Sequence, residues 1–386
     1  MRILHTSDWH AGRVWKSVDR LGELGTVLGN LASTIERERI DLVLVTGDVF
    51  DHGAPPAEAE RVVFEFFKRI GRAGIPSIVI AGNHDSPVRI EAWGTLAELV
   101  HVHTRGLPRP PAKGGVIELT TSGGEDVIIA AVPFAPVVRM LSALDLAEGD
   151  THARQRYATT MQAMLERLTA WFRADAVNLV MAHTHLDGAV IGGSERTVHV
   201  GSEWAATPQM IPATAHYVAL GHIHRPQQVA AAPSPTYYAG SPLQLDFGEA
   251  GQEKTFNVIE VRPGLPARVD LVPYEGGVPL ATVSGTLAEL EASAAQWRGA
   301  GYLKVTVRLQ GPDLEINRKV RALLPNAISV DVELPARDLG GTGERPPADA
   351  APVKLYEAFH RERHQEPATE PVLRAFEDLY AAVSKE

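Results

Sequence analysis

Short apolar runs alternate with longer amphipathic patterns along the first 100 residues of the chain. The runs at 2–8, 41–48 and 76–85 are rich in Ile, Val and Leu on both faces, which is typical of strands in a sheet covered on both sides. The intervening segments, which include 28–40 and 57–74, have the spacing of helices. This alternation predicts an α/β fold.

Similar patterns continue to about residue 280. Further apolar runs predict strands at 126–133, 178–183, 217–222 and 236–242. A long helix is expected over about 152–174. We expect these elements to form one α/β domain with a core of two sheets, over residues 1–279.

The pattern changes beyond residue 280. Residues 280–335 contain helices and strands of alternating polarity, which predicts a small α+β lobe with one solvated sheet face. Residues 336–352 are rich in Gly, Pro and charge and are expected to be a linker. Residues 353–386 return to helical spacing with an apolar stripe. Two short helices bury little by themselves, so we favour binding of this tail to a partner over docking onto its own domain.

Composition limits the class of protein. The chain has 386 residues, of which 45% are hydrophobic, and this suffices for one large core with smaller modules. The absence of cysteine excludes disulfides and cysteine-based zinc sites, and it fits a reducing, cytoplasmic location. The sequence shows neither a signal-peptide pattern nor an apolar run of about 18 residues. A net charge of −10 argues against a generic nucleic-acid binder, so DNA binding would need local charge, a metal site or a partner.

Polar residues that can bind metal ions gather where the predicted strands end. In open α/β sheets, ligands bind beyond the carboxyl ends of the strands, so five separate segments would deliver side chains to one edge. Gly47, Gly82 and Gly221 precede these positions and allow the backbone to turn sharply or approach closely. The candidates are Asp8, His10, Asp48, Asn83, His84, Asp85, His183, His222 and His224.

Alternation along the chain predicts how two pairs of these residues point. Residues i and i+2 of an extended segment face the same way, so Asp8 with His10, and His222 with His224, are expected to aim at one site. Trp9 and Ile223 are expected to point the other way, into apolar packing.

Seven residues form a candidate ligand set: Asp8, His10, Asp48, Asn83, His183, His222 and His224. Seven ligands are too many for one four-coordinate zinc ion, but they suit two cations about 3.5–4 Å apart, with Asp48 as the natural bridge. Imidazole with carboxylate favours Mn, Fe or Zn over Mg or Ca. The resulting positive cluster should attract a phosphate oxygen. His84 could protonate the leaving oxygen, with Asp85 or Asp51 orienting the ring.

Other residues compete for these roles. His185 competes with His183, which we prefer because it directly ends an apolar run. The remaining histidines are interpreted as packed or solvated residues: His5 within the first strand, His101 and His103 on a half-exposed strand, and His360 and His364 on a tail helix. Basic residues just past the motifs are candidates for contact with a DNA backbone: Arg13, Lys16, Arg20 and Arg89.

Several motifs carry a resemblance to a known family. They are DWH at 8–10, GDVFD at 47–51, GNHD at 82–85 and GHIH at 221–224, together with the apolar strand that ends in His183. In order and spacing they resemble the calcineurin-like metallophosphoesterases. The longer strings LGHIHRPQ and YYAGSPLQLDFGE are similar to the bacterial SbcD family of nuclease subunits, which the lobe and the tail also fit.

The resemblance implies a β-sandwich flanked by helices, a DNA-binding capping lobe and a Mn²⁺-dependent nuclease. It implies 3′→5′ exonuclease activity on duplex ends and endonuclease activity on single strands and hairpins, in DNA repair, recombination and replication. It also implies a homodimer within a heterotetramer that contains an SbcC-type coiled-coil ATPase. By the resemblance, one metal takes Asp8, His10, Asp48 and His224, the other takes Asp48, Asn83, His183 and His222, and His84 is the catalytic histidine. The chain departs from archaeal relatives at Asp51, where they have a second catalytic histidine.

Two other functions compete with the nuclease hypothesis. A metallophosphoesterase for small phosphodiesters or phosphoprotein would carry the same motifs. A non-catalytic scaffold with the same fold should have lost ligands, and in this sequence every position of the motif set is filled.

Overall fold

The computed structural model describes residues 1–134, 153–192, 206–334, 351–364 and 366–383. The chain divides into two compact units, one of residues 1–307 and 313–332 and the other of residues 308–312 and 333–386. Most of the predicted lobe falls in the first unit and the predicted tail falls in the second. The predicted linker at 336–352 lies almost wholly outside the described residues, and the four-part division stays a prediction.

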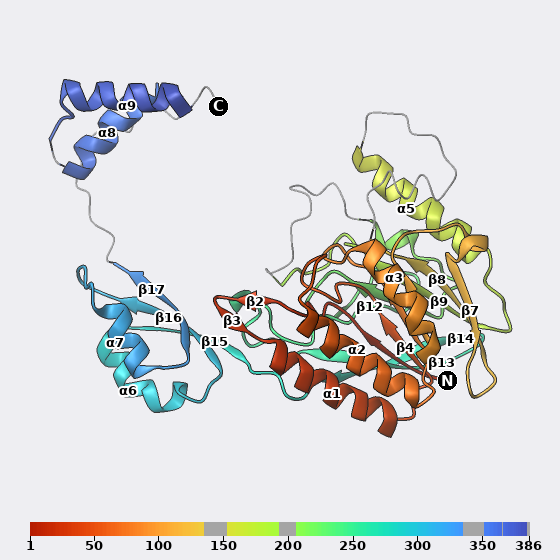
Figure 1. The fold of residues 1–386 in the computed structure, drawn as a ribbon. Coiled ribbons are helices and arrows are strands. Elements are labelled where there is room, and N and C mark those ends of the chain that lie inside the picture. The colour runs from red at the N-terminus through yellow and green to blue at the C-terminus, as the bar shows by residue number, and fades with distance from the viewer. Residues whose placement is uncertain (135–152, 193–205, 335–350, 365, 384–386) are drawn as a thin grey trace. The chain divides into compact units, whose positions relative to one another are not determined.

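Two six-stranded sheets form the core of the first unit (Figure 1). In one sheet the order is β14–β13–β1–β4–β5–β6, with bounds Leu265–Pro273, Thr255–Arg262, Arg2–Thr6, Leu42–Val45, Ser77–Ile80 and Val102–Arg105. In the other the order is β11–β12–β10–β9–β8–β7, with bounds Gln227–Gln228, Thr236–Tyr238, Tyr217–Gly221, Val177–His183, Asp126–Val132 and Val116–Thr120. β1, β4, β5 and β6 run parallel, as do β8, β9, β10 and β12, so within each set the carboxyl ends share an edge.

Helices cover the outer faces of both sheets (Figure 1). α1 (Leu21–Arg37), α2 (Ala57–Arg72) and α3 (Pro87–Ala97) lie on the first sheet, and α5 (Ala153–Thr169) packs against β8 of the second. A separate apolar cluster, with Ile78 from one sheet and Leu179 from the other, fills the space between the sheets. The central strands of both sheets are therefore buried on both faces, although the edge strand β14 is largely exposed, and the predicted sandwich flanked by helices is confirmed.

Short elements complete the first unit. A hairpin is formed by β2 (Val14–Trp15) and β3 (Val18–Asp19). Single 3₁₀ turns occur at η1 (Glu98–Val100), η2 (Pro111–Lys113), η4 (Pro208–Met210) and η5 (Phe247–Glu249). Of these, η5 carries an acidic side chain inward, because Glu249 is fully buried.

The lobe is a three-stranded sheet with two helices. Its elements are β15 (Leu280–Gly285), α6 (Leu287–Trp297), β16 (Tyr302–Arg308), α7 (Ile316–Leu323) and β17 (Ala327–Glu333). Along β16 buried residues alternate with half-buried ones, as predicted for a sheet with one solvated face. α6 begins with a capping box, in which Thr286 and Glu289 each bond the other's backbone N–H.

The tail forms two helices, α8 (Pro352–His364) and α9 (Glu370–Val383). The rings of Tyr356 on α8 and Phe376 on α9 stack at 4.3 Å between centroids, with an interplanar angle of 7°. The two helices expected from the apolar spacing are therefore present and contact each other. Among the helices in the described parts of the chain, none is long and apolar enough to cross a membrane.

Candidate metal centre

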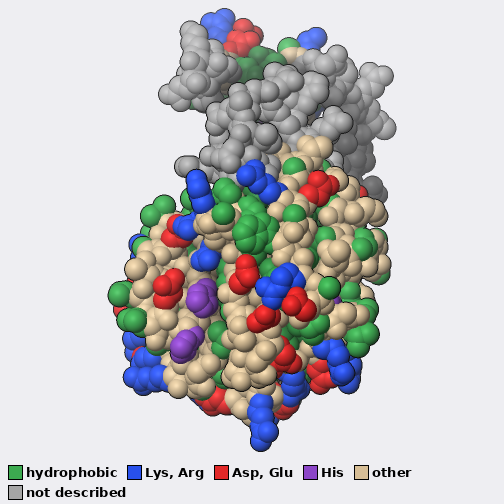
Figure 2. Space-filling view, turned by 90° about the vertical axis from the view of Figure 1, so that its right-hand side faces the viewer, with side chains coloured by type: hydrophobic (Ala, Val, Ile, Leu, Met, Phe, Trp, Pro, Cys, Tyr) green, Lys and Arg blue, Asp and Glu red, His purple; other side chains and the backbone are tan. Residues whose placement is uncertain are grey.

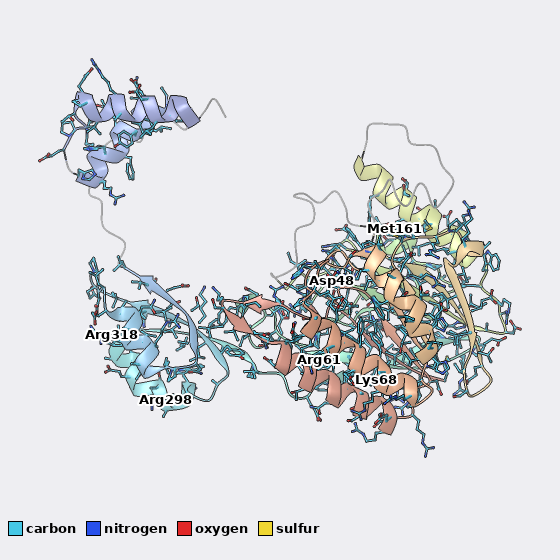
Figure 3. All side chains as sticks on the ribbon, viewed as in Figure 1. Asp48, Arg61, Lys68, Met161, Arg298 and Arg318 are labelled. Carbon is cyan, nitrogen blue, oxygen red and sulfur yellow. The ribbon has the colours of Figure 1, made fainter. Side chains whose placement is uncertain are left out.

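Polar side chains from five segments meet at the edge where β1, β4, β5, β9 and β10 end. Three groups place their ligand atoms within 4.8 Å of one another: Asp8 with His10 and His224, His10 with Asp48 and His84, and Asp8 with Asp48 and His183. In Figure 3 the label of Asp48 locates this region, whereas Arg61 and Lys68 lie on the outer helix α2. All of the clustered residues are buried.

The backbone that carries several of these residues is not extended. β1 and β10 end before the DWH and HIH residues begin. Positive φ angles of 53°, 47°, 47° and 101° occur at Asp8, His10, Asp48 and His222. The predicted reason for the pairing, alternation along a strand, is therefore wrong, because turns just beyond the strands aim these side chains. Trp9 and Ile223 are buried in apolar clusters, as predicted.

Three glycines let neighbouring loops approach one another closely. A Cβ at Gly82 would lie 2.1 Å from Oδ1 of Asp48, and one at Gly221 would lie 1.9 Å from the carbonyl oxygen of Thr46. At Gly47, where φ is 96°, a Cβ would lie 2.3 Å from Nδ1 of His183. Any side chain at these positions would displace the cluster or its supporting backbone, so the predicted close approach is confirmed.

One half of the cluster is centred on facing imidazoles. Nε2 of His10 lies 3.1 Å from Nε2 of His224, and Oδ2 of Asp48 lies 3.8 Å from the same His10 atom. The carboxylate of Asp8 accepts the backbone N–H of His222 at 3.1 and 3.2 Å, which fixes its position beside the pair.

The other half is centred on the amide of Asn83. Its Oδ1 lies 2.9 Å from Nε2 of His183 and 2.9 Å from Nδ1 of His222. Oδ2 of Asp48 lies 3.5 Å from the same His183 atom. Asp48 thus stands between the two halves, where a bridging ligand would stand.

The donor set fits divalent cations. Burial lowers the pKa of His10 far below its usual value and that of His183 to about 3, so both imidazoles are neutral at pH 7 and offer lone pairs. Burial raises the pKa of Asp48, and the nearby charge of Asp8 raises it further. A cation between the two carboxylates would offset this penalty. Neutral imidazoles, carboxylates and an amide oxygen together suit a divalent transition metal.

The histidines outside the candidate ligand set have other surroundings. His185 is half-buried, and its ring centroid lies 6.2 Å from that of His222, whereas His183 is fully buried within the cluster. This favours His183 as the ligand, and the choice stays a prediction. His5 is packed within β1, as predicted, and lies 2.9 Å from the hydroxyl of Tyr217 and 2.8 Å from that of Thr46.

His84 is held at both its backbone and its ring. Its backbone N–H donates to Oδ1 of Asp48 at 2.8 Å, and its Nδ1 lies 2.8 Å from the carbonyl oxygen of Asp51, to which it donates. Donation from Nδ1 leaves Nε2 as the atom that can exchange a proton. The main chain of Asp51 therefore orients this ring.

The two carboxylates predicted to orient His84 have other partners. Those of Asp85 are the backbone N–H groups of Val49, Phe50 and Gly82, at 3.2, 3.0 and 2.9 Å. These hydrogen bonds connect the loop after β4 to the loop after β5. Burial raises the pKa of Asp85 to about 6. Oδ1 of Asp51 lies 3.3 Å from Nδ1 of His10. The catalytic assignment of both residues stays a prediction.

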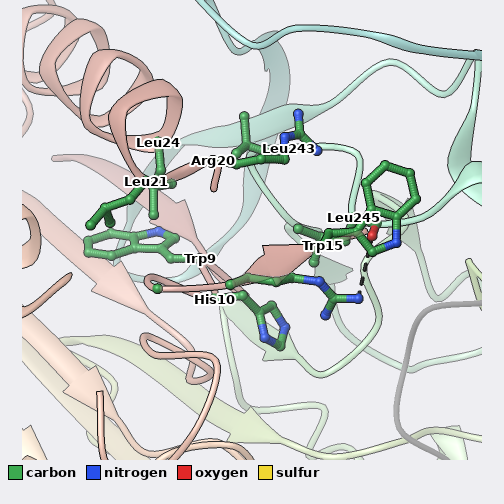
Figure 4. A pocket seen from close by; sticks show the side chains of 10 residues that line it. Trp9, His10, Trp15, Arg20, Leu21, Leu24, Leu243 and Leu245 are labelled. Atoms are coloured by element: carbon green, nitrogen blue, oxygen red, sulfur yellow. Dashed lines mark hydrogen bonds between the residues drawn. The ribbon is translucent and has the colours of Figure 1, made fainter. Parts of the chain in front are cut away.

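A small apolar pocket lies behind His10 (Figure 4). It is lined by Trp9, Trp15, Leu24 and Leu243, among others. Arg13 also lines the pocket and donates to the carbonyl oxygen of Leu245 at 3.4 Å, a bond drawn as a dashed line in Figure 4. His10 also lines this pocket, so mainly apolar side chains lie beside this part of the cluster.

The basic residues considered for DNA contact have partners within the protein. Arg20 is buried and donates to Glu23 at 2.9 Å and to the carbonyl oxygen of Val278 at 3.1 Å, so the prediction is wrong for this residue. Arg89 pairs with Glu60 at 2.6 Å. For Arg89, as for Arg13 and Lys16, DNA contact stays a prediction.

Glu249, the last residue of the string YYAGSPLQLDFGE, was not assigned a role from the sequence, and it is fully buried beside His224. Its Oε1 lies 3.4 Å from Nδ1 of His224 and its Oε2 lies 2.6 Å from Nζ of Lys254. Metal-binding histidines commonly give their second nitrogen to a carboxylate, so an acid near His224 could have been sought. No spacing rule indicates which acid it is.

Two lines of similarity connect the chain to known proteins. Residues 1–226 match the profile of the family described as Calcineurin-like phosphoesterase. A protein of Bacillus subtilis (strain 168), named as the SbcD component of the SbcCD nuclease, is 36% identical over 281 residues, which are 72% of this chain and 71% of that protein. A protein of the same name from Rhodobacter capsulatus is 31% identical over 382 residues, 92% of this chain and 91% of that protein.

Solved structures resemble the chain more distantly. The protein TT1561 of Thermus thermophilus has 14% identity and a TM-score of 0.39, and the match covers 70% of this chain and 98% of that one. A dimetal phosphatase from Danio rerio has 9% identity and a TM-score of 0.39, over 71% and 99% of the two chains. These scores are too low to support an argument. The family profile and the sequence relatives decide the assignment: the chain belongs to the calcineurin-like phosphoesterase family and, within it, to the SbcD nuclease subunits.

Proposed function

We propose that this chain is the metal-dependent nuclease subunit of an SbcCD-type complex and hydrolyses DNA phosphodiester bonds. The observation that carries the proposal is the buried cluster of carboxylates and imidazoles in a chain whose relatives are named nuclease subunits. We further propose 3′→5′ exonuclease activity on duplex ends and endonuclease activity on single strands and hairpins, in DNA repair and recombination.

Two Mn²⁺ ions are the proposed cofactor. One ion would be held by Asp8, His10, Asp48 and His224, and the other by Asp48, Asn83, His183 and His222. Mixed nitrogen and oxygen donors favour a transition metal over Mg²⁺ or Ca²⁺, which prefer oxygen ligands alone. Such ions supply Lewis acidity and charge stabilisation for displacement at phosphorus.

His84 is the proposed proton donor. Its Nδ1 is occupied by the carbonyl oxygen of Asp51, so the protonated ring presents Nε2–H to the leaving oxygen. The residue is 6% exposed, and its ring meets that of His10 edge-on, with centroids 4.6 Å apart. His84 therefore borders the cluster and still has access to solvent. In the hydrolysis the oxygen of a water molecule forms the new bond to phosphorus, and as the bond to the leaving oxygen breaks, that oxygen takes the Nε2 proton.

DNA has to approach a protein of net charge −10. On the face shown in Figure 2, Lys and Arg side chains lie interspersed with Asp and Glu, so this face has no broad field of one sign. Attraction of phosphate is therefore expected to come from the metal centre and from a partner subunit.

The tail is proposed to bind an SbcC-type ATPase. α8 and α9 leave Leu355, Phe359, Leu379 and Tyr380 between 39% and 68% exposed. A pair of amphipathic helices with uncovered apolar side chains suits docking onto a coiled coil.

A homodimer within a heterotetramer is also proposed. Val88 and Leu96 on α3 and Leu99 just after it are 73%, 73% and 82% exposed. The rings of Phe64 on α2 and Trp93 on α3 meet at 5.5 Å between centroids. Apolar exposure of this size on neighbouring helices suits contact with a second copy of the chain.

The test is cleavage of end-labelled duplex, hairpin and single-stranded DNA with Mn²⁺, with and without the ATPase. We expect cleavage that EDTA abolishes. Absence of DNA cleavage under all conditions, together with strong turnover of bis(p-nitrophenyl) phosphate, would replace the proposal with a phosphoesterase for small substrates.

A further inference from the structure

Three candidate histidine ligands have an oxygen atom within 3.4 Å of the nitrogen that faces away from the cluster, and two of them, His183 and His224, form a hydrogen bond with it. Nδ1 of His183 lies 2.8 Å from the carbonyl oxygen of Thr46. Nδ1 of His10 lies 3.3 Å from Oδ1 of Asp51. Nδ1 of His224 lies 3.4 Å from Oε1 of Glu249. Such contacts fix the tautomer and the orientation of an imidazole, and a carboxylate also raises its basicity.

Glu249 is the more enclosed of the two carboxylates among these acceptors. Its side chain is fully buried in η5, whereas that of Asp51 is 23% exposed. Oε2 of Glu249 accepts from the backbone N–H of Leu245 at 3.0 Å as well as from Lys254 at 2.6 Å. These two bonds hold the carboxylate, so that Oε1 faces the His224 ring.

Lys254 also holds the main chain of His224 through a hydrogen bond. Its Nζ donates to the carbonyl oxygen of His224 at 2.8 Å while it also pairs with Glu249. One buried cation thus anchors both the main chain of the histidine and the carboxylate behind its ring. The opposite nitrogen of that ring, Nε2, lies 3.1 Å from Nε2 of His10 inside the cluster.

A buried ion pair can also serve the fold alone, and the chain contains one for comparison. Arg20 and Glu23 are 5% and 8% exposed, and Glu23 also accepts the backbone N–H of Val278 at 2.6 Å. Among its hydrogen bonds and ion pairs in the described structure, none involves a candidate metal ligand. The Glu249–Lys254 pair differs because its carboxylate faces an imidazole of the cluster.

We propose that Glu249 is a positioning residue for His224, that Lys254 holds it in place, and that the pair sets the affinity of the ion that His224 binds. This inference rests on the proposed metal centre. Removing a partner of this kind typically weakens metal binding about 10- to 100-fold. The ion held by Asn83, His183 and His222 should keep its affinity, because the carboxylate of Glu249 faces the His224 ring at the other half of the cluster.

The experiment measures Mn²⁺ binding by the full-length chain with calorimetry and with the EPR signal of free Mn²⁺. Wild type should bind two ions. Glu249→Gln should bind one ion unchanged and the other about 10- to 100-fold more weakly. Its cleavage of DNA should need correspondingly more Mn²⁺ for half-maximal rate, with kcat at saturating Mn²⁺ restored to within a few-fold of wild type. Glu23→Gln is the matched control, and it should lower the unfolding temperature without changing either affinity.

The outcomes separate the inference from the function on which it rests. Wild type that binds no Mn²⁺ would overturn the proposed metal centre itself. Wild type that binds two ions, with Glu249→Gln unchanged in both affinities, would overturn only the positioning role. If Glu249→Gln unfolds, Lys254→Arg and Glu249→Asp, which keep the charges and shift the carboxylate, should show the same selective weakening. Equal loss of both ions in these variants would also overturn the proposal.

Discussion

The candidate metal centre and the two tail helices, α8 and α9, depart in opposite ways from the usual burial of apolar side chains and exposure of polar ones. At the edge, Asp8 and His183 are polar and fully buried. In the tail, Leu379 and Tyr380 are 68% and 50% exposed. Buried polar groups and exposed apolar surface both cost free energy unless something covers or pairs them. The kind of side chain that is out of place in each region supports the component proposed for it, which is cations at the edge and a partner protein at the tail.

The two regions also differ in the contacts that hold them in place. At the edge, backbone N–H groups of His84 and His222 hold the carboxylates of Asp48 and Asp8. In the tail, the helices meet through side chains such as the stacked rings of Tyr356 and Phe376. We expect cations to enter a preformed site and a partner to bind a helical pair that can adjust.

Replacing the carboxylate between the two halves should have the largest effect. Asp48→Asn is expected to lose both ions and to lower DNA cleavage on the order of 10³-fold or more. Because burial raises the pKa of Asp48, ionising this carboxylate costs stability, so the metal-free variant should be more stable than metal-free wild type. Elemental analysis and thermal unfolding in EDTA measure both. Two ions per chain in the variant would show that Asp48 is not the bridge.

Removing the proposed proton donor should separate chemistry from metal binding. His84→Ala is expected to lower cleavage about 10²- to 10⁴-fold and to keep both ions, because its backbone bond to Asp48 remains. His52→Ala, at an exposed neighbour, is the control and should retain activity. Loss of an ion in His84→Ala would instead make this residue a ligand.

Substitutions in the tail helices should not change the activity of the metal centre. A variant with serine at four exposed apolar positions of the tail is expected to raise the Kd for the ATPase about 100-fold or more. These positions are Leu355, Phe359, Leu379 and Tyr380. Cleavage of single strands by the isolated chain should not change. Alanine at Glu370 and Arg374, an exposed ion pair on α9, is the matched control and should bind normally. Unchanged affinity of the serine variant, measured by calorimetry, would exclude this apolar face as the binding surface.

The smallest expected effect concerns a buried histidine outside the ligand set. Burial lowers the pKa of His5 from 6.5 to about 3, so the unfolded chain binds a proton that the folded chain rejects. The stability that His5 contributes is present above pH 6.5 and is lost as the pH falls toward 3, by up to about 1.4 kcal/mol per unit. Urea unfolding of metal-free protein should show a shallower loss between pH 6.5 and 5 for His5→Gln. Exposed His52→Gln should follow wild type, and equal slopes for His5→Gln would contradict the expectation.

Most of the sandwich could be predicted because its central strands are buried on both faces. Leu42–Val45 and Ser77–Ile80 consist almost wholly of apolar residues, which separates them clearly from the amphipathic helices beside them. Element ends were less predictable. α5 stops at Thr169, short of the expected end near 174. This end could not be predicted, because residues 170–174 contain no glycine or proline to mark it.

Site residues could be predicted where a single polar residue at the end of an apolar strand marked them. They could not be predicted where contacts between distant parts of the sequence form the site. Asp48 and His183 could be recognised because a polar residue directly follows or ends an apolar run. Glu249 and Lys254 reach His224 from 25 and 30 residues away, a distance that no local pattern encodes. The turn at Asp8 likewise depends on a backbone bond to Gly47 from another loop.

The positive φ angles of His10 and His222 have a consequence for chains that share this fold. A non-glycine residue in left-handed backbone costs about 1–2 kcal/mol, and histidine has only part of the tolerance that Asn and Asp show there. A descendant freed from holding ions would gain stability by placing glycine or asparagine at these two positions. The imidazoles at these two positions are thus held in place at a local backbone cost that a metal-bound cluster would offset.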